Sequence, residues 1–249
     1  MPTSEILVTE ENHICTVKFN RPHQKNAINE AMYTALSDAM IAADNDPDVH
    51  VLLITGDESC FTAGNDLREF LEKPPTSKDS PGFRFLRTLV GLQKPLVAAV
   101  NGPAVGIGTT LLLHCDLVYA GESAVFILPF INLGLCPENA CSLLLPQTAG
   151  HRRAAELLML GEPFNAETAQ TLGIINSACP DAETMEHALA TAEKLAAKPP
   201  LALRQTKALM KSASKKAVQE MLYEEIQVFS TLLHSAEAKA AMTAFLRKS

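Results

Sequence analysis

The sequence has no long apolar runs and no excess of basic residues. Its longest apolar runs, such as Leu96–Val100 and Val125–Leu128, are the length of strands, too short to span a membrane. Lysine and arginine number 21 against 28 aspartates and glutamates, and the formal net charge is −7. This balance disfavours nucleic acid and anionic membranes as partners, although a few local cations can still hold a small anion. The N-terminus carries acids where a signal peptide needs a basic start, so we expect a cytoplasmic protein.

Sequence motifs for metals, phosphates and a nucleophilic serine are also missing. The six cysteines never form Cys-x-x-Cys, and we interpret them as reduced thiols. His114, Cys115 and Asp116 are consecutive, so their side chains point in different directions on a helix or a strand. There is no Gly-x-Ser-x-Gly, no phosphate loop and no complete Gly-x-Gly-x-x-Gly. We therefore expect no metal site.

What is present is an α/β pattern of short strands and amphipathic helices. The chain has 249 residues, of which 47% are hydrophobic, so it can bury a substantial core as one large domain or one domain with an appendage. Periodicity predicts strands at Ile14–Phe19, Val49–Thr55, Leu96–Val100, Leu117–Ala120, Val125–Leu128 and Ile174–Ala178. It predicts helices at Asn29–Ala43, Ala154–Leu160, Ala166–Leu172 and Thr184–Ala197.

The C-terminal part is expected to be helical throughout. We divide the chain into a core with the site, residues 1–197, and a helical region, residues 198–249, for packing and oligomerisation. An apolar stripe at Val218–Leu233 packs against either the same chain or a neighbour, and it leads us to expect self-association. The polar, proline-rich segment Glu72–Gly82 is predicted to be a loop.

Two glycine-containing turns, Phe61–Leu67 and Gly102–Gly108, follow two of the predicted strands. Glycines let the backbone approach a ligand closely, and a helix that begins after Gly106 starts with N–H groups that have no internal partner. Such donors suit an oxygen that gains negative charge during a reaction. Each turn can equally be a simple strand-to-helix connection.

The motifs FTAGNDL (61–67), KPLVAAVNGPAVGIGTTLLLHCDLVYA (94–120) and PFINLGLCPE (129–138) resemble those of the crotonase, or enoyl-CoA hydratase/isomerase, superfamily. NRPHQKNAIN (20–29) and AAELLMLGEPFNAETAQTLGIIN (154–176) extend the resemblance over nearly the whole chain. It implies an α/β spiral of ββα units with a C-terminal helical region, assembled as a homotrimer or hexamer. It also implies an acyl-CoA thioester as substrate, whose enolate is stabilised by two backbone N–H groups, with no metal, flavin or nicotinamide.

Carried over by motif, the resemblance implies that the two oxyanion-hole N–H donors belong to Asn65 and Ile107. The residues that it implies for substrate binding are Ala63, Gly64, Asn65, Asp66, Leu67, Arg68, Gly106 and Phe130. Arg68 matches a position that lines the coenzyme A site in relatives, and Lys25 is a second cation for the phosphates. Both can equally be solvated surface charges.

The two glutamates of a hydratase are absent, because Thr110 and Phe130 occupy their positions. Hydration needs an activated water and a proton donor, and neither side chain can act as such a group. Glu138 remains, in an otherwise apolar segment, and it matches the single catalytic glutamate of the Δ3,Δ2-enoyl-CoA isomerase branch related to the peroxisomal enzymes. One carboxylate suffices to move a proton from C2 to C4.

We predict that apolar surroundings raise the pKa of Glu138, namely Phe130, Ile131, Leu133, Leu135 and Leu143–Leu145. The alternative is that Glu138, after a proline, is an ordinary acid at a helix start. Asn139 stands where relatives often have glycine. The resemblance thus favours an isomerase; the alternatives are another crotonase reaction, such as hydration, and a non-catalytic acyl-CoA-binding or scaffold module.

Overall fold

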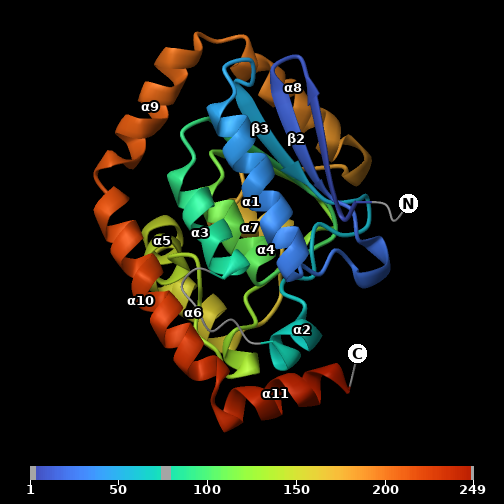
Figure 1. Ribbon diagram of the computed structural model, residues 1–249, viewed down its shortest axis with the longest axis vertical. Helices are drawn as coiled ribbons and strands as arrows, with labels where there is room; N and C mark the ends of the chain where they lie inside the picture. Colours follow the sequence, from blue (N-terminus) through green and yellow to red (C-terminus); the bar gives the residue numbers. More distant parts are fainter. Residues whose placement is uncertain (1–3, 74–79, 248–249) are drawn as a thin grey trace.

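The larger sheet forms the centre of the molecule (Figure 1). The computed structural model describes residues 4–73 and 80–247. Within them, six strands pair in the order β1-β2-β3-β4-β6-β9, with β1 antiparallel to β2 and the other pairs parallel. The strands are β1 (Ile6–Glu11), β2 (Ile14–Phe19), β3 (Val51–Thr55), β4 (Leu96–Val100), β6 (Leu117–Gly121) and β9 (Ser177–Cys179). The register sets Leu52 beside Leu96 and Val97 beside Leu117.

A smaller sheet lies beside the first and carries the second glycine turn. It pairs β5 (Pro103–Val105) in parallel with β7 (Val125–Ile127), which is antiparallel to β8 (Phe164–Asn165).

Helices surround both sheets. The α-helices are α1 (Glu30–Asn45), α2 (Leu67–Glu72), α3 (Pro81–Gly91), α4 (Ile107–Thr110), α5 (Cys141–Ala149), α6 (His151–Leu160), α7 (Ala166–Thr171), α8 (Thr184–Ala196), α9 (Pro200–Ser212), α10 (Lys215–Leu233) and α11 (Ala236–Leu246). The 3-10 helices are η1 (Pro22–Gln24), η2 (Leu111–His114), η3 (Ile131–Leu133) and η4 (Asp181–Glu183).

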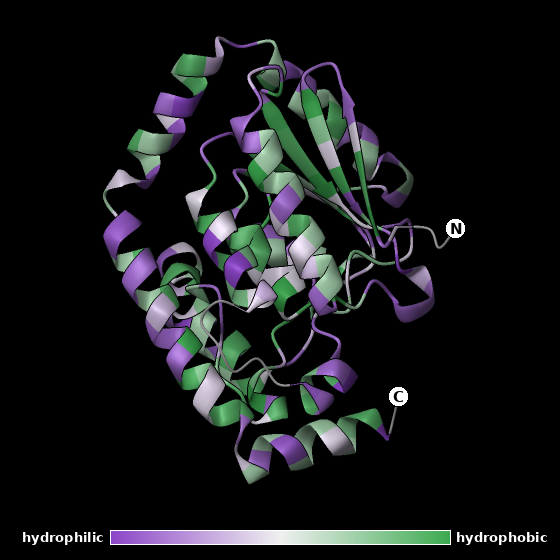
Figure 2. Cartoon of the chain, viewed as in Figure 1, coloured by the Kyte–Doolittle hydropathy of each residue, from purple (hydrophilic) through white to green (hydrophobic). Residues whose placement is uncertain are grey.

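The larger sheet is covered on both faces, which explains why its central strands are apolar throughout. One face packs Val51, Leu53 and Val97 against Ala188 and Ala192 of α8. The opposite face carries the main core, where the alternate residues of the same strands meet α1 and α3. In Figure 2 hydrophobic residues run along the central strands, whereas the outer helices alternate hydrophobic and hydrophilic residues.

The α/β class predicted from the sequence is confirmed, and the strands predicted at Ile14–Phe19 and Leu96–Val100 have the predicted bounds. The last strand was placed too early, because Ser177 and not Ile174 begins β9. The helix α3 was missed, since Pro81 and Gly82 were assigned to a loop but open this helix. Residues 74–79 of that predicted loop lie outside the described residues.

The C-terminal helices return to the body of the same chain. In Figure 1 α9 runs along one side, α10 packs against α3 and α5, and α11 lies beside α2. The apolar stripe of α10, including Val218, Leu222 and Phe229, is buried within the chain. Core packing is therefore the correct interpretation of this stripe, and self-association cannot be argued from it. The domain boundary at residue 197 stays a prediction.

Among residues 4–73 and 80–247, no helix is both long enough and apolar enough to cross a membrane.

Candidate active site

The two glycine turns, far apart in the sequence, lie directly against each other. The Thr62 N–H donates to the Pro103 carbonyl oxygen (3.1 Å), and the Val105 N–H donates to the Thr62 carbonyl oxygen (3.0 Å). Gly64 has a φ of +85°, and a Cβ on it would lie 2.6 Å from the Val105 carbonyl oxygen. Only glycine fits both this backbone conformation and this close approach.

The pairing of the turns leaves two backbone donors without a partner. Ile107 is the first residue of α4, so no carbonyl of its own helix can accept its N–H. Asn65 lies between Gly64, whose carbonyl accepts from the Ile28 N–H, and Asp66, whose N–H donates to the Ile28 carbonyl. Within the described part of the chain, neither the Asn65 N–H nor the Ile107 N–H donates to a backbone carbonyl. Both donors are therefore free to bind an oxygen of a ligand.

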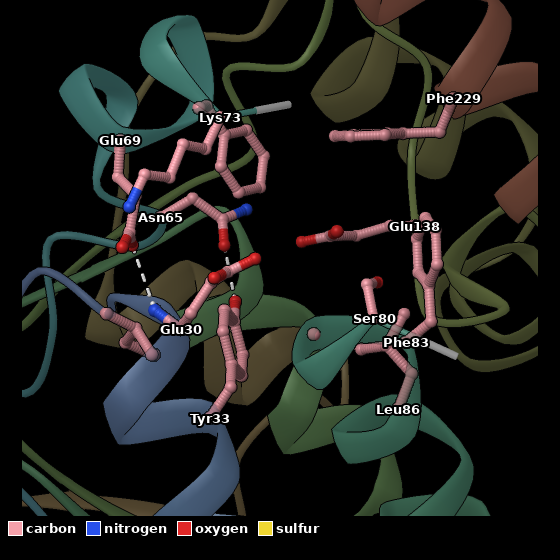
Figure 3. A pocket seen from close by; sticks show the side chains of 13 residues that line it. Glu30, Tyr33, Asn65, Glu69, Lys73, Ser80, Phe83, Leu86, Glu138 and Phe229 are labelled. Atoms are coloured by element: carbon pink, nitrogen blue, oxygen red, sulfur yellow. Dashed lines mark hydrogen bonds between the residues drawn. The ribbon is translucent and has the colours of Figure 1, made fainter. Parts of the chain in front are cut away.

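Asn65 and Glu138 face the same pocket. Its walls come from α1, α2, α3 and α10 (Figure 3). The residues that line it are Ile28, Glu30, Tyr33, Asn65, Glu69, Phe70, Lys73, Ser80, Gly82, Phe83, Leu86, Glu138 and Phe229.

Glu138 is a buried carboxylate with a strongly shifted acidity. Its side chain is almost completely buried, and its Oε1 atom has no hydrogen-bond partner among the described residues. Burial, together with the charge of Glu225, raises the pKa of Glu138 to about 8, although a hydrogen bond with the Asn65 side chain acts in the opposite direction. The group can therefore take up and release a proton near neutral pH.

The predicted rise in the pKa of Glu138 is confirmed. The neighbours in sequence, Phe130–Leu135 and Leu143–Leu145, do not line the pocket. The apolar wall comes instead from distant residues, chiefly Phe83 of α3 and Phe229 of α10. A carboxylate in an apolar segment of the sequence indicates that its side chain is buried. Which residues form the pocket around it depends on the tertiary packing.

Tyr33 orients the side chain of Asn65. The Tyr33 hydroxyl donates to the Asn65 Oδ1 atom, and the tyrosine is itself buried on α1. Because the carbonyl end of the carboxamide is engaged, the amide end is turned toward Glu138, as Figure 3 shows. Asn65 thus faces Glu138 with its side chain while its backbone N–H stays free.

The interpretation of Glu138 as a helix-start acid is wrong. Helix α5 begins at Cys141, after Asn139 and Ala140, which have φ values of +65° and +55°. The left-handed conformation of Asn139 suits asparagine, which tolerates it better than most residues other than glycine. The acid that meets the N-terminus of α5 is Glu225, whose Oε1 accepts from the Ser142 N–H (2.8 Å).

The positions of the two missing hydratase glutamates are buried and lie outside this pocket. Thr110 is fully buried in α4, and its hydroxyl has no partner among the described residues. Phe130 is buried in the core, 4.0 Å from the point where a Cβ on Gly106 would lie.

The remaining residues implied for substrate binding are dispersed. Asp66 caps α2 and forms a 2.8 Å ion pair with Arg21. Arg68 is exposed and, with Arg21 and Lys73, lines a surface depression next to the pocket; Lys73 lines both. Ala63 and Leu67 line neither cavity, and Lys25, which is exposed, lines neither as well.

Tyr33, Phe229 and Glu225 were not recognised as site residues from the sequence. Tyr33 and Phe229 carry no local signal, because they belong to helices that look like ordinary core helices. Glu225 did carry one, since it interrupts the apolar stripe of α10 between Leu222 and Ile226. In the described part of the chain, no group of three histidine, cysteine, aspartate or glutamate residues is arranged to hold a metal ion.

Comparisons with known proteins agree with the fold. A family model described as enoyl-CoA hydratase/isomerase matches residues 9–249. The chain is 36% identical to the 2,3-dehydroadipyl-CoA hydratase of Escherichia coli (strain K12), over 98% of this chain and 96% of that protein. It is 35% identical to the human enoyl-CoA delta isomerase 2, over 98% of this chain and 63% of that protein. Among solved structures, Pseudomonas aeruginosa OdaA superposes with a TM-score of 0.96 at 46% identity, covering 98% of this chain and 99% of that one.

Proposed function

Because the chain belongs to the crotonase, or enoyl-CoA hydratase/isomerase, family, we propose that it shifts a double bond of an acyl-CoA thioester from Δ3 to Δ2. The family membership supports a general activity, that of an acyl-CoA hydratase or isomerase of crotonase fold. The observation that supports the specific reaction, the shift from Δ3 to Δ2, is Glu138, a buried carboxylate that faces the pocket beside Asn65. Thr110 and Phe130 replace the two hydratase glutamates.

In the proposed reaction, Glu138 is the only proton carrier. Its ionised carboxylate removes a proton from C2, and the electron pair of that C–H bond moves toward the thioester carbonyl to give a dienolate. The free N–H groups of Asn65 and Ile107 hydrogen-bond the oxygen that becomes negative. Glu138 then returns the proton to C4, and the double bond ends between C2 and C3. No water takes part, which suits a pocket lined by Phe83 and Phe229.

The surface depression beside the pocket is our candidate for the phosphates of coenzyme A. Arg68 and Lys73 are both exposed there, and Lys73 also lines the pocket. Arg21 is partly neutralised by its ion pair with Asp66, so it offers less charge to an anion.

Hydration is the second candidate, because the relative from Escherichia coli is named a hydratase. A hydratase and an isomerase of this fold share the enolate and its two N–H donors; they differ in the acid/base groups. In this chain Thr110 and Phe130 occupy the positions of the two hydratase carboxylates, and neither side chain can activate water, which argues against hydration.

An assay of the two substrates in parallel tests the choice. We expect 3-enoyl-CoA to be isomerised at least ~10² times faster than 2-enoyl-CoA is hydrated, because one lost acid/base group costs about that factor. Absorbance at the conjugated thioester band follows both reactions on one preparation. Comparable rates on the two substrates would contradict the isomerase, and faster hydration would establish the second candidate.

The proposal includes assembly as a homotrimer or hexamer. Leu201, Leu209 and Met210 of α9 are 69%, 72% and 77% exposed, so this helix presents apolar side chains that none of the described residues covers. We expect light scattering at micromolar concentration to give three or six times the chain mass of 26.8 kDa. A monomer mass would contradict the proposed assembly.

A further inference from the structure

Glu225 is a second buried carboxylate close to Glu138. It lies on the buried face of α10, between Leu222 and Ile226, and one helical turn before Phe229 of the pocket wall. Its side chain is 5% exposed, although no ion pair is formed with it in the described part of the chain. An isolated buried carboxylate is costly unless hydrogen-bond donors surround it.

Donors from the N-terminus of α5 surround Glu225. Its Oε1 accepts from the Ser142 N–H (2.8 Å) and from the Ser142 hydroxyl (2.5 Å). Burial raises the pKa of Glu225 above its usual range, against hydrogen bonds from Ser142, Ala140 and Cys141 that lower it. The groups that contact Oε1 are donors, whereas Oε2 has no hydrogen-bond partner among the described residues. Through Oε1 the side chain of Glu225 replaces the missing N-cap side chain of α5.

The segment held in this way carries Glu138. Asn139 and Ala140, which join Glu138 to α5, both have left-handed backbone conformations, so the surroundings must fix them. His114 hydrogen-bonds the Asn139 carbonyl oxygen through its Nε2 atom (2.8 Å). Burial lowers the pKa of His114 to about 4, so this histidine is neutral and can donate without adding charge. The side chains of His114 and Glu225 thus both hold the segment, one at the Asn139 carbonyl and the other at Ser142.

We propose that Glu225 is a positioning residue, which fixes the segment Asn139–Ser142 and thereby sets the orientation and the charge state of Glu138. The inference rests on the proposed role of Glu138 as the proton carrier. It assigns to the C-terminal helix α10 a part in the reaction beyond the pocket wall formed by Phe229.

The negative charge of Glu225 also acts on Glu138 through space, adding to the burial that raises the pKa of Glu138. The other ionisable groups near the pair are the Tyr33 hydroxyl and the Cys136 and Cys141 thiols, each with a raised pKa and therefore neutral. Glu30, Glu69 and Lys73 stand at the pocket wall. Glu225 is thus the charge whose removal should change Glu138 most.

Two substitutions separate the charge from the hydrogen bonds. Glu225→Gln removes the charge and keeps an oxygen acceptor for Ser142, whereas Glu225→Ala removes both. Glu224→Gln, at the exposed neighbouring position, is the matched control. For each protein, kcat and KM are measured on 3-enoyl-CoA from pH 6 to 10, together with the melting temperature. In protein labelled with [δ-13C]glutamate, NMR follows the titration of the Glu138 carboxyl without any turnover. The Glu138 signal is identified as the one that is absent from the spectrum of Glu138→Gln.

In the wild type the rate should rise with pH as Glu138 loses its proton, with a midpoint near 8. In Glu225→Gln the midpoint of both the rate and the NMR titration should move down by about one pH unit, because a like charge has been removed. In Glu225→Ala, kcat should fall at least ~10-fold with KM within about twofold, since a misplaced base affects the chemical step. Glu224→Gln should match the wild type.

A lowered melting temperature with unchanged kcat and midpoint in both Glu225 variants would overturn the inference and reduce Glu225 to a helix cap. If Glu225→Ala does not fold, the test rests on Glu225→Gln, through the midpoints of its rate profile and of its NMR titration. A wild type that does not isomerise 3-enoyl-CoA refutes the proposed function; in that case the NMR titration still supports or overturns the effect of Glu225 on Glu138.

Discussion

Glu138→Gln should bind acyl-CoA and lose at least ~10² of its isomerisation rate, the lower end for loss of a general base. The amide keeps the size of the side chain but cannot accept a proton from C2. Binding should survive, because the N–H groups of Asn65 and Ile107 belong to the backbone of other turns. Steady-state kinetics on 3-enoyl-CoA and titration with a saturated acyl-CoA measure the two properties separately.

The stability of the wild type relative to this variant should fall as the pH rises. The folded protein holds the pKa of Glu138 at about 8, above its ordinary value of 4.5, so the folded state binds the proton more tightly than the unfolded state. The stabilisation linked to this proton is complete below the unfolded value and is lost as the pH rises through about 8. Glu138→Gln cannot lose it, so its melting temperature should exceed that of the wild type at pH 9 and approach it at pH 6.

Glu122→Gln, an exposed carboxylate in the turn before β7, is the control for both measurements and should behave as the wild type. Full isomerase activity in Glu138→Gln would refute the proposed role of Glu138, whatever happens to the melting temperature.

The features that could be predicted from the sequence are local ones. The central strands are recognisable because a strand buried on both faces needs an uninterrupted apolar run, as in Leu96–Val100. The glycine turns are recognisable because a positive φ and a close backbone approach leave no alternative residue, as at Gly64. Glu138 stood out because an acid in an apolar segment needs a reason.

What the sequence could not give is the set of partners that tertiary packing brings together. The apolar wall around Glu138 comes from α3 and α10, about 50 residues before it and 90 after it in the chain. The sequence also did not show which acid meets the N-terminus of α5. Pro137-Glu138 has the pattern of a helix start, yet the acid that accepts from the Ser142 N–H is Glu225 of α10. The left-handed Asn139 and Ala140 break the local rule, and only the surrounding contacts can hold them.

Gly64→Ala should cause the second large loss. A Cβ at this position would lie 2.6 Å from the Val105 carbonyl oxygen, so one of the two paired turns has to move. Asn65 directly follows Gly64 in the first turn, whereas Ile107 belongs to the second turn. A movement of either turn therefore changes the distance between the N–H groups of Asn65 and Ile107. Losing one donor of this kind costs ~10²–10³ in rate. We expect kcat on 3-enoyl-CoA to fall by that factor, while Glu138 keeps its place in the pocket.

The comparison with two other glycines distinguishes the clash from the backbone strain. Gly150 has a similar φ of +81° but open space around a Cβ, so Gly150→Ala should cost about 1 kcal/mol of stability and leave kcat unchanged. Gly91, on α3, has neither a positive φ nor a neighbour within 4 Å, so Gly91→Ala should change neither property. Melting temperature and kcat on the three variants give the answer: if Gly64→Ala loses stability like Gly150→Ala but keeps full activity, then the Asn65 N–H does not stabilise the enolate.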